Sequence, residues 1–65
     1  MAKTIKRWNS QKNCTEYLHR RYPVASFIDD EMYCLKLDEA GAKSVSAELR
    51  SRGIAHEIIE VEGNH

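Results

Sequence analysis

The clearest indication of the fold comes from the stretch VASFIDDEMYCLKL, which covers residues 24–37. Two apolar runs, Val24–Ile28 and Met32–Leu37, flank the acidic turn Asp29-Asp30-Glu31. Runs of this length around a polar turn are typical of a β-hairpin. With Asp30-Glu31 as the loop, strand alternation predicts a core-facing set: Val24, Ser26, Ile28, Tyr33, Leu35 and Leu37. The opposite face then holds Ala25, Phe27, Met32, Cys34 and Lys36.

The segment before this hairpin has the features of a helix that ends at Pro23. Asn9 and Asn13 are both candidate N-caps, and Glu16 follows Asn13 in capping-box order. The residue before a proline avoids the α region, which sets the end of the helix. One face repeats at helical spacing and consists of Cys14, Tyr17, Leu18 and Arg21. A short strand over Lys3–Trp8 precedes the helix.

The segment after the hairpin predicts a second helix and a final strand. Asp38 is a suitable N-cap, and Gly53 stands at the C-cap position. The apolar stripe between them consists of Ala42, Val45 and Leu49, with Ser46 beside it. Ile54–Val61 reads as the last strand. The order β-α-β-β-α-β predicts a small ferredoxin-like α+β sandwich, an antiparallel sheet with two helices on one face. The alternative, α-β-β-α-β, omits the first strand.

Length and composition predict a single domain over residues 1–65, with 42% hydrophobic and 31% charged residues. So short a chain has a small core and often relies on a disulfide, a metal or a partner subunit. The two cysteines do not form a disulfide framework, and the N-terminus does not resemble a signal peptide. We therefore expect a cytoplasmic protein with free thiols, a Cys14–Cys34 bridge being the alternative. No apolar run approaches the roughly 20 residues of a membrane helix.

Charge is unevenly distributed along the chain although the net charge is zero. Residues 1–23 carry six basic residues and one acid, for +5, whereas residues 24–65 carry four basic residues and nine acids, for −5. Such asymmetry can indicate a nucleic-acid or membrane surface. In one compact domain we favour the reading in which the two halves lie together and neutralise each other.

The reactive side chains do not form a recognisable catalytic or metal-binding motif. The five cysteines and histidines lack the closely spaced ligand pairs of structural zinc sites: Cys14, Cys34, His19, His56 and His65. Cys34 and His56 lack an evident oxyanion donor and a third orienting residue. No glycine-rich phosphate loop precedes either predicted helix. We expect no enzyme activity, no metal and no cofactor.

Two binding hypotheses remain. The first is a protein-binding module, an inhibitor or regulator of a larger protein or of a nucleic-acid-processing assembly, with a homodimer as a further expectation. Its binding surface is an exposed apolar patch with an adjacent acidic turn, formed by Phe27, Met32, Cys34, Asp29, Asp30 and Glu31. The alternative is nucleic-acid binding by cations interleaved with an aromatic residue, namely Lys6, Arg7, Trp8, Lys12, Arg20 and Arg21. The identity of the partner stays open.

Overall fold

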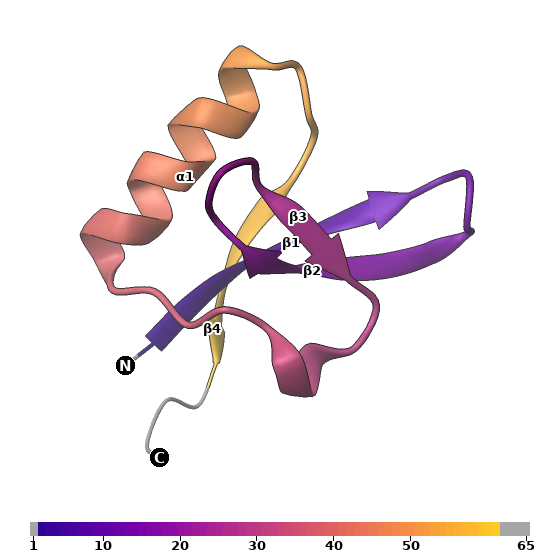
Figure 1. Ribbon diagram of the computed structural model, residues 1–65, viewed down its shortest axis with the longest axis horizontal. Helices are drawn as coiled ribbons and strands as arrows, with labels where there is room; N and C mark the ends of the chain where they lie inside the picture. Colours follow the sequence, from indigo (N-terminus) through magenta and orange to yellow (C-terminus); the bar gives the residue numbers. More distant parts are fainter. Residues whose placement is uncertain (1, 62–65) are drawn as a thin grey trace.

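A computed structural model describes residues 2–61 and shows, within them, a four-stranded antiparallel sheet and one α-helix (Figure 1). The strands lie in the order β3-β2-β1-β4. The elements are β1 (Ala2–Asn9), β2 (Cys14–Arg20), β3 (Ser26–Ile28), the 3₁₀ turn η1 (Glu31–Tyr33), α1 (Glu39–Ser51) and β4 (Glu57–Val61). The chain order is therefore β-β-β-α-β.

The predicted first helix is wrong, because residues 14–20 form β2 instead. The Asn9 side chain, predicted as a helix cap, accepts hydrogen bonds from the backbone of Gln11 (3.0 Å) and Lys12 (3.1 Å) and closes a turn. Asn13 then adopts a positive φ of 56°, which asparagine tolerates in turns. The chain reverses and β2 pairs with β1. The two-helix, ferredoxin-like sandwich is thereby excluded for the described residues.

The predicted hairpin over residues 24–37 is also wrong. β3 pairs with β2, placing Phe27 opposite Leu18. The Asp30 carboxylate accepts a hydrogen bond from the Met32 backbone N–H at 3.0 Å, and this contact begins η1 where the second strand was expected. The chain then runs to β1, where Leu37 and Lys3 exchange backbone hydrogen bonds of 2.7 and 2.8 Å. The alternative without a first strand fails as well, because β1 is present.

The helix predicted after Asp38 is confirmed as α1. The Asp38 carboxylate accepts a hydrogen bond from the Gly41 N–H at 2.7 Å, and Gly53 has a φ of 74° just beyond the C-terminus of the helix, as left-handed helix termination requires.

The core lies between α1 and one face of the sheet, and its buried cluster comprises Ile5, Leu18, Val45 and Leu49. Phe27, Leu35 and Leu37 pack at its margin, whereas Val24 and Tyr33, expected in the core, are exposed.

The basic and acidic ends of the sequence meet across the sheet. Lys3 lies 3.4 Å from Glu60, and Lys6 lies 3.6 Å from Glu57, so β1 and β4 neutralise each other as expected. Cys14 and Cys34 are free thiols. Within residues 2–61, no helix combines the length and the apolarity needed to cross a membrane. His65, considered above as a metal ligand, lies outside the described residues.

Candidate protein-binding surface

One face of the sheet lies away from α1, and we call it the outer face. Ile5 is buried against the helix, so alternation along β1 directs Thr4, Lys6 and Trp8 to the outer face. The pairing register places one residue from each strand in a row across this face, Glu57–Lys6–Tyr17–Ile28. In Figure 1, α1 lies to one side of the sheet, and the tip of the β1–β2 hairpin extends beyond the other elements.

A hollow of about 620 Å³ opens where η1 and the following segment approach the end of β4. Cys34 and Lys36 alternate with Leu35 and Leu37, which pack against the core, so the first two point to the outer face. The hollow is lined by Asp30, Glu31, Met32, Cys34, Lys36, Glu60 and Val61. Four of the six predicted protein-binding residues are among these, and we call the site the acidic hollow.

The acidic hollow combines an exposed apolar side chain with carboxylates. Met32 is 79% exposed, and the neighbouring Tyr33 is 59% exposed. Glu60 has Lys3 as an ion-pair partner, but within residues 2–61 neither Asp30 nor Glu31 has a cationic group within 4.0 Å. The lining therefore combines the apolar Met32 with three carboxylates, those of Asp30, Glu31 and Glu60, and one cation, Lys36. The predicted residue Asp29 is exposed and precedes it in the chain.

Phe27 is the member of the predicted patch that the structure places elsewhere. Its side chain is half-buried and packs against the core. The Arg7 guanidinium lies over its ring, 4.7 Å from the centroid. The reversed alternation of β3 explains this position: Phe27 is opposite Leu18, whose side chain is fully buried on the α1 side.

The six residues of the predicted nucleic-acid surface do not share one face. Lys6 and Trp8 belong to the outer face, whereas Arg7 lies over Phe27 on the α1 side. Three of the five cations already contact carboxylates, since Lys6 pairs with Glu57 and both Arg7 and Lys12 pair with Glu16. Of the remaining two, Arg21 donates a hydrogen bond to Ser44 at 2.9 Å, and Arg20 is exposed.

Glu16 is a buried carboxylate with a full set of partners. Its Oε1 atom accepts hydrogen bonds from Arg7 Nη2 and Asn9 Nδ2, both at 3.1 Å. Burial alone raises the pKa of Glu16, but the hydrogen bonds from Asn9 and Arg7 and the charges of Arg7 and Lys12 act in the opposite direction. The net result is a pKa below its usual value. Glu16 therefore stabilises the fold as an anion.

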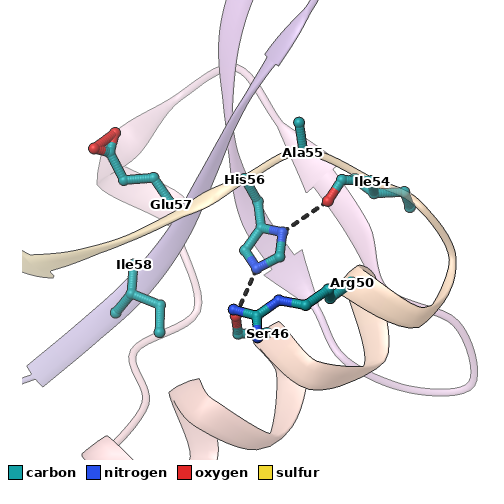
Figure 2. Close-up of a pocket in the computed structure, with 7 residues that line it drawn as sticks. All are labelled: Ser46, Arg50, Ile54, Ala55, His56, Glu57 and Ile58. Carbon is teal, nitrogen blue, oxygen red and sulfur yellow. Dashed lines mark hydrogen bonds between the residues drawn. The ribbon is translucent and has the colours of Figure 1, made fainter.

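A second, smaller pocket of about 360 Å³ lies between α1 and the start of β4 (Figure 2). Ser46 Oγ lies 2.6 Å from His56 Nε2, and His56 Nδ1 lies 2.8 Å from the Ile54 carbonyl oxygen. Because a carbonyl only accepts, Nδ1 carries the proton, so in the neutral ring Nε2 accepts from the Ser46 hydroxyl. Sequence reasoning missed this pair, although a serine beside the apolar stripe of a predicted helix was a signal for a buried hydroxyl.

The Ser46–His56 pair is the arrangement in which an imidazole can withdraw a hydroxyl proton, and it also ties the strand start to the helix. Ser46 is only 6% exposed. Cys34 and His56, considered together above, line different pockets. Within residues 2–61, no three His, Cys, Asp or Glu side chains gather in a group that could hold a metal ion.

Comparison of the chain with protein-family models, curated protein sequences and solved structures finds no match.

Proposed function

We propose that this protein is a protein-binding module whose acidic hollow receives a basic, partly apolar segment of another protein. The observation that carries the proposal is the exposed Met32 side chain in a hollow whose Asp30 and Glu31 carboxylates have no cationic partner within residues 2–61. An unbranched thioether adapts its shape to different apolar partners. Carboxylates in the lining favour cationic partners and speed their encounter.

The local backbone supports recognition because the hollow is already formed. Asp30 caps η1 through the Met32 N–H, and Leu35 N–H donates to the Leu18 carbonyl at 2.7 Å. Both contacts hold the segment that carries Met32 and Cys34, so little ordering is required on binding. Basic segments are typical of proteins that contact nucleic acid. A module that occupies such a segment competes with the nucleic acid, which fits a regulator or inhibitor of a nucleic-acid-processing assembly.

Site-specific photo-crosslinking tests the proposal. A photoreactive amino acid replaces Met32 in one sample and Ala47, an exposed residue of α1, in the control sample. We expect position 32, and not position 47, to crosslink to a distinct protein in nuclease-treated lysate. Glu31→Lys should reduce that product about tenfold, because it places a cation where the basic segment binds, whereas the neutral Glu31→Gln should reduce it less.

The same experiment contains the outcomes that contradict the proposal. Equal crosslinking from positions 32 and 47, or a product indifferent to Glu31→Lys, would show that the acidic hollow is not the binding surface. Nucleic-acid binding stays a prediction. It would be favoured if the crosslinked product disappeared on nuclease treatment and if Arg20→Ala weakened binding to different sequences alike.

A further inference from the structure

β4 lies at the edge of the sheet and pairs with β1 on one side only among the described strands. It has five residues, Glu57–Val61, whereas the opposite edge, β3, has three. An edge strand presents backbone N–H and C=O groups that another chain can pair with. β4 is therefore the longer of the two edges available for strand addition.

The β1 hydrogen bonds show which β4 groups point outward. Lys3 exchanges both of its backbone hydrogen bonds with Leu37, on the side of β1 away from β4. In an antiparallel ladder the residue opposite Lys3 is then in a non-hydrogen-bonded pair, and that residue is Glu60. It follows that Ile59, opposite Thr4, directs its N–H and C=O to β1, whereas Ile58 and Glu60 direct theirs to the free edge.

We propose that β4 binds β4 of a second copy of this chain, antiparallel, about a two-fold axis through Ile59. Ile58 then faces Glu60 of the partner subunit, and each such pair exchanges both of its backbone hydrogen bonds. The contact is isologous and closes after two subunits. It forms one continuous sheet through the dimer, and two residues of the contact, Glu60 and Val61, also line the acidic hollow.

The positions of the two glutamates in β4 and the length of the strand favour this register, and they favour a second copy of the chain as the partner of β4. Glu57 faces Val61 of the partner subunit, so no acid opposes an acid, and both glutamates keep their own lysine partners. An axis through Glu60 would place that acid opposite its own copy, which is unfavourable. An axis through Ile58 would extend the pairing past the start of β4. Only the axis through Ile59 uses all five residues.

The monomer also leaves apolar surface for such a contact. Ile58 is 37% exposed, and among residues 2–61 the buried hydrophobic core is limited to Ile5, Leu18, Ala42, Val45 and Leu49. A domain with so small a core gains stability from a partner subunit. The pairing covers the exposed edge of β4, and Ile59 meets Ile59 of the partner subunit on the outer face.

Light scattering on purified protein tests the dimer with a matched pair of variants. Glu60→Pro removes an outward N–H without removing a β1–β4 hydrogen bond, because proline is tolerated on an edge strand whose N–H faces solvent. Glu60→Ala removes the same carboxylate but keeps the N–H. We expect the unmodified protein and Glu60→Ala to be dimers and Glu60→Pro to be a monomer with an unchanged circular dichroism spectrum.

A disulfide trap provides a test that does not depend on how the proline variant folds. In a Cys14→Ser, Cys34→Ser background, Ile59→Cys places two thiols opposite each other in a non-hydrogen-bonded pair, where side chains approach closely. We expect rapid oxidation to a covalent dimer, and none for Thr15→Cys. A protein that is monomeric at submillimolar concentration, a Glu60→Pro dimer or a failure of Ile59→Cys to crosslink would each overturn the proposal. The monomer result would leave β4 to a different peptide.

Discussion

Glu16 of β2 contacts both β1 and the turn that connects β1 to β2. Glu16 is 3% exposed, and its carboxylate lies between Arg7 of β1 and Lys12 of the turn. Removing one partner of a buried ion pair is costly, because it leaves the other charge uncompensated. Because Arg7 and Lys12 pair with Glu16, two cations of the predicted nucleic-acid surface already contact a carboxylate.

The lowered pKa of Glu16 predicts how stability depends on pH. A carboxyl group whose pKa is lower in the folded than in the unfolded protein stabilises the fold above its ordinary pKa of 4.5. That contribution is lost as the pH falls from about 4.5 through the lower pKa of the folded protein, because the native state must then be protonated. Urea denaturation between pH 7 and pH 3 should show this loss.

Glu16→Gln should lower the free energy of unfolding by about 1–3 kcal/mol at pH 7, as expected for hydrogen bonds to a charged group. It should also weaken the dependence on pH below 4.5. Glu48→Gln is the matched control, because Glu48 pairs with Arg52 on the exposed surface of α1 and exposed pairs contribute little. Equal changes in the two variants would contradict the role given to Glu16.

Glu16 also explains why β2 could not be predicted from the sequence. Cys14, Glu16 and Leu18 alternate along the strand toward the α1 side, but a charged residue in the middle hides the apolar alternation. The partners that make its burial favourable lie on β1 and in the turn, and the sequence alone does not show that they meet. The competing helical spacing of Cys14, Tyr17 and Leu18 was therefore the more visible pattern.

Among the elements, α1 was predictable because its signals are local. The Asp38 cap, the apolar stripe and Gly53 all lie within the helix or next to it. β1 and β4 were likewise expected close to their observed positions. The prediction of a second hairpin strand was wrong because the backbone groups of Leu35 and Leu37 bond to Leu18 and Lys3, which are distant in sequence.

The link between α1 and β4 yields a prediction at the scale of these two elements. Ser46→Ala leaves the His56 Nε2 acceptor without its hydroxyl donor and should cost about 1–2 kcal/mol of stability. Ser51→Ala is the control, because the exposed Ser51 hydroxyl donates to the Glu48 carbonyl within the same helix. Thermal or urea unfolding measures both, and a Ser46→Ala variant as stable as Ser51→Ala would show that the pair does not hold the elements together.

For the whole molecule, one helix on one face leaves the acidic hollow, the β4 edge and the exposed Trp8 of the outer face available to partners (Figure 1), whereas Thr4 on the same face is fully buried. Four of the seven residues that line the hollow were predicted as binding residues, because Asp30, Glu31, Met32 and Cys34 are close in sequence. Lys36 was expected on the same face as Met32 and Cys34, whereas Glu60 and Val61 join the hollow only through the observed sheet order. The β4 edge was not predictable without that order either.

Residues 14–20 form the strand β2, which pairs with β1, and this pairing defines the outer face of the sheet. NMR measurement of Hα–Hα nuclear Overhauser effects tests it most directly. Lys6 opposite Tyr17 and Trp8 opposite Thr15 are the non-hydrogen-bonded pairs that follow from the Lys3 hydrogen bonds, with Cα atoms about 4.5 Å apart. We expect strong cross-strand effects for both pairs. Their absence, with helical contacts from Cys14 to Tyr17 and Leu18 instead, would contradict the account.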